Sequence, residues 1–146
     1  MLAKGYLIII ASFVWIGFLG GISFLESWLK FKAPGITIPL GLGIGRLVFS
    51  ALNKIEWVLA AIIVLNLAFR SEPLLKAGSI AFFVPVVLLV IQTIWLLPAM
   101  DARAQLVVAG KEMPPSHLHI WFVGMETIKV ASLFTFGLLL LKQTNK

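Results

Sequence analysis

Eight polar side chains lie in or beside stretches that are otherwise apolar, and their chemistry makes them the candidate site of this chain. They are Arg46, Asn53, Glu56, Asp101, Arg103, His119, Glu126 and Lys129. Hydrocarbon solvates a charge poorly, so an ionisable residue inside a membrane span indicates function. Guanidinium, ammonium and carboxyl groups together form ion pairs or clamp a small anionic or hydrogen-bonding ligand. We predict from these residues a buried polar cluster or a ligand-binding pocket at one end of the protein.

The densest part of this set is MPPSHLHIWFVGMETIK, residues 113–129. Its two prolines end whatever helix precedes them, because proline lacks an N–H and clashes with the previous turn. Ser116 is suited to cap a new helix, since its hydroxyl accepts from N–H groups of the first turn. On that helix His119, Glu126 and Lys129 share one face, being seven and three residues apart.

Depth along the helices predicts which charges meet. Glu56 lies about 21 Å before Arg70, the expected end of its span, at 1.5 Å per residue. Lys129 lies about 20 Å before Lys142 by the same rise. We therefore expect Lys129 to pair with Glu56 or with Glu126, which lowers the cost of burying either charge. A ligand clamped by the same groups is the alternative.

A metal site is a further alternative, with His117, His119 and Glu126 as its ligands. Di-metal carboxylate bundles use Glu-x-x-His at helical spacing, and this chain lacks that motif. His117 and His119 diverge by about 200° on a helix, so they do not form a chelating pair. Haem ligated by His119 alone is equally compatible with the sequence. The simplest reading is that both histidines anchor the helix at the membrane interface.

Composition indicates whether the chain is a soluble or a membrane protein. The chain has 146 residues, of which 60% are hydrophobic and 12% charged, with a mean hydropathy of +1.04. Soluble domains carry about 25% charged residues, so the chain is predicted to be an integral membrane protein. The absence of cysteine excludes disulfides and thiolate sites. The net charge of +6 suits anionic lipid head groups, and no basic cluster is dense enough for nucleic acid.

Four apolar runs are long enough to cross a bilayer, which takes about 20 residues. The predicted spans cover about 6–29, 40–69, 74–100 and 118–141. The first run is too long for a signal-peptide core and is read as a retained span. The short link 70–76 requires antiparallel neighbours, which predicts an all-α, up-down four-helix membrane bundle in a single transmembrane domain, 1–146, with both termini on one side. Pro85 and Pro98 are expected to kink the third span.

Small residues predict where helices approach closely. Gly17 and Gly21 form one pair spaced four apart, and Gly41 and Gly45 form another. Besides the lipid bilayer, the expected partners are therefore a second copy of the chain or a larger membrane complex that packs on these two faces.

Short motifs along the chain resemble a family of small four-span membrane proteins. They are Gly20-Gly21-Ile22-Ser23-Phe24, the Pro/Gly stretch before Arg46, Asp101-Ala102-Arg103-Ala104 and the histidine-led fourth span. The family includes animal transmembrane proteins linked with platinum-drug resistance and copper-resistance-like bacterial relatives. The resemblance implies the four-span architecture and no settled activity. We expect a multi-pass protein of the bacterial inner membrane.

The leading functional prediction is the binding or transport of a small or lipid-like ligand in a polar pocket between the second and fourth spans. A membrane oxidoreductase or a haem- or metal-binding protein that uses the histidines and carboxylates is the alternative from another class. An accessory subunit of a larger complex, packed through its glycine faces, is the third. No nucleophile, base and orienting group stand together, so the sequence does not predict a hydrolase.

Overall fold

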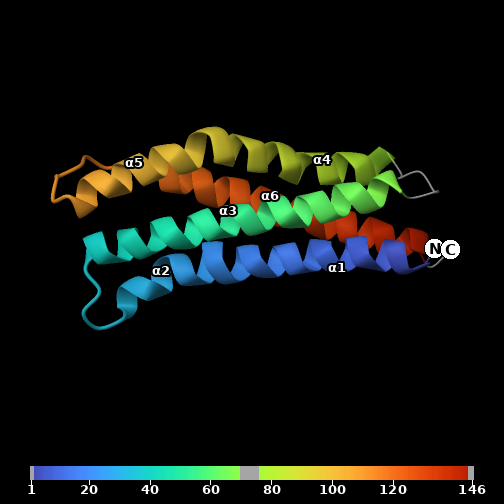
Figure 1. Cartoon of the computed structure of the whole chain (residues 1–146), viewed down its shortest axis with the longest axis horizontal. Coiled ribbons are helices and arrows are strands. Elements are labelled where there is room, and N and C mark those ends of the chain that lie inside the picture. The colour runs from blue at the N-terminus through green and yellow to red at the C-terminus, as the bar shows by residue number, and fades with distance from the viewer. Residues whose placement is uncertain (1, 70–75, 145–146) are drawn as a thin grey trace.

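The computed structural model describes residues 2–69 and 76–144, which form four long antiparallel helices in one bundle (Figure 1). Within this part of the chain, the segments apolar and long enough to cross a membrane are Gly5–Lys32, Ile38–Ala68, Ala77–Val108 and Leu118–Gln143. The predicted all-α four-helix membrane bundle is confirmed, and the first and last helices bring both termini to the same end (Figure 1). The link 70–75, and with it the predicted start of the third span, lies outside the described residues.

The first span changes its winding along its length. It begins as α1 (Leu2–Phe18), widens into the π-helical segment η1 (Leu19–Glu26), and ends as α2 (Ser27–Leu29) and the 3₁₀ turn η2 (Lys30–Lys32). Gly20 and Gly21 lie in the π-helical segment, where their weak helix propensity lowers the cost of leaving regular α geometry. The chain then turns at Pro34-Gly35, with Gly35 at a φ of 79°.

The second span is one uninterrupted helix, α3 (Ile38–Ala68). Thr37 caps it, its Oγ1 accepting a hydrogen bond from the N–H of Leu40 at 3.3 Å. Gly41 and Gly45 are buried near the start of α3, and a side chain at either position would meet Phe31 or Lys30. The predicted packing surface on these glycines therefore contacts the chain's own first span. That a partner also packs there stays a prediction.

The third span also changes winding, in the sequence α4 (Lys76–Ile91), the π-helical η3 (Gln92–Leu96) and α5 (Leu97–Val108). Pro98 is the second residue after η3. It has no N–H to donate and its ring crowds the carbonyl one turn back, so the helix loosens before it. The span continues past its predicted end at residue 100, because the segment 101–108 is built of good helix formers. It ends at Gly110, whose φ of 81° accompanies a hydrogen bond from Lys111 N–H to Leu106 O.

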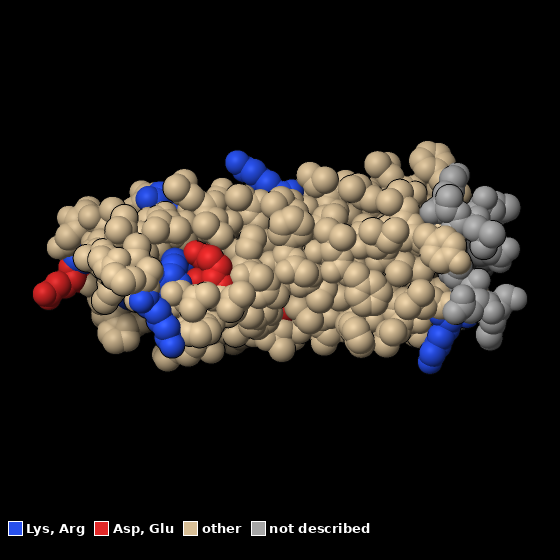
Figure 2. Space-filling model, turned by 90° about the horizontal axis from the view of Figure 1, so that it is seen from below, with Lys and Arg blue, Asp and Glu red and all other residues tan. Residues whose placement is uncertain are grey.

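The fourth span is α6 (Leu118–Thr144), which starts beside the predicted cap. Ser116 Oγ accepts a hydrogen bond from the N–H of Leu118 at 3.2 Å. The apolar core lies in the half of the bundle next to the termini and includes Trp15, Ile63, Leu89 and Phe136. Figure 2 shows a broad surface almost without charged atoms over that half, with most acidic and basic atoms gathered toward the opposite end. The lipid bilayer is the environment that this surface fits.

Candidate functional site

Three charged side chains meet inside the bundle and form what we call the buried cluster: Glu56, Glu126 and Lys129. Their exposed fractions are 3%, 0% and 0%. Lys129 Nζ lies 2.7 Å from Glu126 Oε1 and also forms an ion pair with Glu56 Oε2. The predicted pairing of Lys129 with Glu56 or Glu126 is confirmed, and Lys129 pairs with both. Each charge therefore has an opposite charge at contact distance, which offsets part of its desolvation.

Neutral donors from the other two spans complete the buried cluster. Trp15 Nε1 donates to Glu56 Oε2 at 2.8 Å. Glu126 accepts at both oxygens, from Ser23 Oγ at 2.7 Å and from Gln92 Nε2 at 2.8 Å. All four spans thus contribute a side chain to one hydrogen-bonded network. Its bonds hold the spans together inside the apolar part of the bundle.

The two π-helical segments are what bring neutral donors to Glu126. Ser23 belongs to η1 and Gln92 belongs to η3, and both are about 99% buried. A π-helical turn takes one more residue than an α-helical turn, so it rotates a side chain away from the position that regular winding would give it. Such segments occur frequently at functional sites, and here both face the same carboxyl group.

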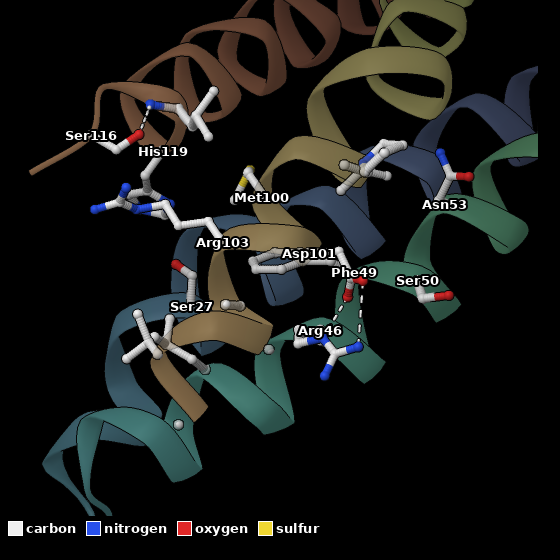
Figure 3. A pocket seen from close by; sticks show the side chains of 18 of the residues that line it. Ser27, Arg46, Phe49, Ser50, Asn53, Met100, Asp101, Arg103, Ser116 and His119 are labelled. Atoms are coloured by element: carbon white, nitrogen blue, oxygen red, sulfur yellow. Dashed lines mark hydrogen bonds and ion pairs between the residues drawn. The ribbon is translucent and has the colours of Figure 1, made fainter. Parts of the chain in front are cut away.

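A second polar region, which we call the pocket, opens at the end of the bundle remote from the termini (Figure 3). Its volume is about 720 Å³, within the range of small-molecule sites. Segments of all four spans line it. Its polar and aromatic lining residues include Ser27, Lys30, Arg46, Phe49, Asn53, Thr93, Asp101, Arg103, Ser116 and His119. Apolar side chains such as Leu97, Met100 and Val107 form much of the remaining wall.

Most charges around the pocket are already paired. Arg46 Nε donates to Asp101 Oδ1 at 2.5 Å, and Gln105 Nε2 donates to the other carboxyl oxygen of Asp101 at 2.7 Å. Lys30 Nζ lies 3.1 Å from Glu26 Oε2 on the next turn. These pairs orient the arginine and the lysine without neutralising the whole lining, because Arg103 adds a further positive charge.

Arg103 is a cation of the pocket whose N–H donors are mostly unused by the described residues. It donates to the carbonyl oxygen of Pro114, and none of the described carboxyl groups lies within ion-pair distance of it. A guanidinium group carries five N–H donors, so most of its hydrogen-bonding capacity is available to a ligand. His119 lies beside it at the mouth of the pocket (Figure 3) and stacks on Phe122, with ring centroids 6.5 Å apart. Arginine and histidine together make this rim a suitable place for an anionic group.

An aromatic pair separates the pocket from the buried cluster. Phe49 lines the pocket and packs edge-on against the buried ring of Phe122, with centroids 4.9 Å apart. Phe49 precedes Glu56 on α3, and Phe122 precedes Glu126 on α6, so the rings lie roughly 6–10 Å nearer the pocket end. The two polar regions are therefore neighbours along the bundle axis, with these two rings between the mouth of the pocket and the buried cluster.

The eight predicted site residues consequently fall into two groups. Arg46, Asn53, Asp101, Arg103 and His119 line the pocket, whereas Glu56, Glu126 and Lys129 form the buried cluster. The predicted shared face of α6 is present, but depth divides it: His119 lies at the mouth of the pocket and the other two lie inside the bundle.

The suggested metal ligands are not brought together. His117 is exposed and does not line the pocket, His119 stacks on Phe122, and Glu126 bonds to Lys129. In residues 2–69 and 76–144 no three histidine, cysteine, aspartate or glutamate side chains are grouped so that they could hold a metal ion. The alternative ligand set of His117, His119 and Glu126 is therefore wrong as a single site.

Sequence reasoning missed Trp15, Ser23 and Gln92 in the buried cluster and Lys30 in the pocket. Gln92 carries a usable signal, since it is the strongly polar residue of its apolar span and such a residue needs a partner. Trp15 and Ser23 give no comparable signal, because tryptophan and serine are ordinary in membrane helices.

Comparisons of the chain with protein-family models, with curated proteins and with solved structures find no match. The family resemblance drawn from short motifs therefore stays a prediction.

Proposed function

We propose that this integral membrane protein binds an amphiphilic anion in the pocket. The acidic head group contacts Arg103 at the rim, and the apolar part lies along Leu97, Met100 and Val107. The observation that carries the proposal is a cavity of about 720 Å³ whose rim holds a guanidinium group with no carboxylate partner among the described residues. Arginine recognises carboxylate and phosphate groups through paired N–H donors, and an apolar wall accepts a hydrocarbon chain.

The charges of the lining support an anion rather than a cation. Lys30, Arg46 and Arg103 face the pocket, against the single carboxylate of Asp101. Asp101 already accepts hydrogen bonds from Arg46 and Gln105, so it has little capacity left for a cationic ligand. A lipid-like anion could also reach the pocket from the membrane interface, where such molecules concentrate.

Binding is the step that the geometry supports best, and transport would need more. A ligand that crossed the bundle from the pocket would have to pass the ring pair Phe49–Phe122 and then the buried cluster. Both would have to rearrange for every molecule moved. We therefore restrict the proposal to the binding of an amphiphilic anion.

The test is native mass spectrometry of the protein in a non-ionic detergent, with myristate as the probe and myristyl alcohol as its uncharged counterpart. We expect one bound myristate and much weaker binding of the alcohol. Arg103→Gln should weaken myristate binding about tenfold to a hundredfold, because charge-assisted hydrogen bonds contribute about 1.5–3 kcal/mol.

The matched control is Lys54→Gln, which removes an exposed cation of α3 that does not line the pocket. This variant should bind myristate as the unchanged protein does. Equal binding of myristate and myristyl alcohol, or an equal loss in the Lys54 and Arg103 variants, would contradict the proposal.

A further inference from the structure

The charges of the buried cluster do not balance. Glu56 and Glu126 supply two carboxyl groups and Lys129 supplies one amino group, so full ionisation leaves one net negative charge. All three side chains are at least 97% buried inside four apolar helices. An uncompensated charge in such surroundings is costly, and it is relieved when a counter-charge binds. We propose that the buried cluster is a proton-binding site, in which the two carboxyl groups and Lys129 together hold one additional proton.

No other described group is placed to supply the missing positive charge. In the pocket half of the bundle, Lys30 pairs with Glu26 and Arg46 pairs with Asp101. Lys54 is exposed. Arg103 and His119 lie at the pocket, beyond the ring pair that separates the two regions. The donors from α1, η1 and η3 are the neutral side chains of Trp15, Ser23 and Gln92, which stabilise a carboxylate without changing the charge count.

One carboxyl oxygen of the buried cluster supports the bound proton independently of the charge count. Glu56 Oε2 accepts from both Trp15 and Lys129, but Glu56 Oε1 has no hydrogen-bond partner within the described parts of the chain. Both oxygens of Glu126 are engaged, by Ser23, Gln92 and Lys129. A buried carboxylate oxygen without a donor is unfavourable, whereas a protonated carboxyl group no longer carries the charge that demands one. Oε1 of Glu56 is therefore the open position for the proton.

This inference concerns the buried cluster alone and does not depend on a ligand in the pocket. Infrared spectroscopy near neutral pH, in a detergent free of esters, detects a protonated carboxyl group by its C=O stretch, apart from the carboxylate and amide bands. The unchanged protein should show this band, and incorporation of ¹³C-labelled glutamate should shift it. That result needs no variant. A spectrum without the band would overturn the proposal, including the case in which a metal cation balances the charge.

Variants then test how many protonated carboxyl groups the buried cluster holds. Glu56→Gln and Glu126→Gln each leave one carboxylate with one ammonium group, so either change should abolish the band. Lys129→Met leaves two carboxyl groups without a cation, so the band should become about twice as intense. The control is Glu112→Gln, in the exposed loop before α6, which should leave the band unchanged. A band that survives both glutamate changes, or that disappears with Glu112, would also overturn the proposal.

Discussion

The two polar regions of this protein use the same kinds of side chain in different surroundings. In the pocket, Arg46 pairs with Asp101, and these side chains are 32% and 42% exposed. In the buried cluster, Lys129 pairs with Glu56 and Glu126, and water reaches almost none of the three. The pocket thus has charges that can exchange their partners for a ligand or for water. The buried cluster has charges that depend on one another.

Burial decides how much each ion pair contributes to stability. An exposed pair typically contributes about 0–1 kcal/mol, because water solvates both partners when the pair opens. Removing one partner of a buried pair costs about 3–5 kcal/mol in soluble proteins, because the other charge remains without compensation. The comparison therefore predicts that substitutions in the buried cluster affect folding and that substitutions in the pocket affect binding.

The largest effect is expected for Lys129→Met. It removes the only positive charge of the buried cluster and leaves two carboxyl groups facing each other. We expect a loss of about 3–5 kcal/mol in the free energy of unfolding, measured by denaturant titration in detergent. Lys54→Met, on the exposed side of α3, is the matched control and should leave stability almost unchanged.

A double-mutant cycle sharpens this expectation. Glu56→Gln alone should cost less than Lys129→Met, because Lys129 retains Glu126 as a partner. Adding Glu56→Gln to Lys129→Met should recover part of the loss, since an amide then replaces one of the two buried carboxyl groups that would otherwise have to take up a proton. Strictly additive losses would show that these residues do not interact and would contradict the buried cluster as described.

The next largest effect is expected for Trp15→Phe. The change keeps an aromatic ring in the core and removes the N–H that donates to Glu56. Removing the donor of a buried acceptor costs about 1–3 kcal/mol, so we expect a loss in that range by the same titration. Trp57→Phe is the matched control. Trp57 is 39% exposed and its Nε1 donates to Thr93 Oγ1. This change should lower the free energy of unfolding by about 1 kcal/mol or less. Equal losses of unfolding free energy in the two variants would contradict the expected difference between a buried and an exposed donor.

A smaller effect on stability is expected for Asp101→Asn at the pocket. The change removes the charge opposite Arg46 but leaves a polar group of the same shape. Stability should fall by about 1 kcal/mol or less, because the pair is partly exposed. Myristate should bind more tightly, since the pocket loses its one lining carboxylate; this is measured by the mass-spectrometric titration. A large loss of stability would place this pair with the buried cluster instead.

The smallest effect is expected for Gly17→Ala on the exposed face of α1. Apart from the adjoining residues and backbone of its own helix, no described atom lies within 4 Å of the added methyl group, and alanine is the better helix former by about 1 kcal/mol. The unfolding free energy should therefore stay the same or rise slightly. A loss of stability that grows as the protein is concentrated would instead show that a second copy packs on this face.

The fold could be predicted from the sequence because membrane spans depend on length and hydropathy, which are properties of single segments. The pairing of Lys129 with Glu56 could also be predicted, since the rise per residue sets the depth of each charge. Ser23 could not be assigned, because η1 changes the helix winding and thereby which side chains face inward. Trp15 lies in the regular helix α1 and could not be assigned because tryptophan is ordinary in membrane helices. The division into two regions depends on the contact between Phe49 and Phe122, and sequence spacing does not reveal which rings meet across helices.

The central claim is that the pocket binds the amphiphilic anion and that the buried cluster makes no contact with it. The most direct test is the shift in melting temperature that myristate produces in two variants, Arg103→Gln and Glu126→Gln. The account predicts that Arg103→Gln melts as the unchanged protein does and shows a much smaller shift with myristate. Glu126→Gln should melt at a different temperature on its own and retain the full shift. A full shift in Arg103→Gln, or none in Glu126→Gln, would contradict the separation of the two regions.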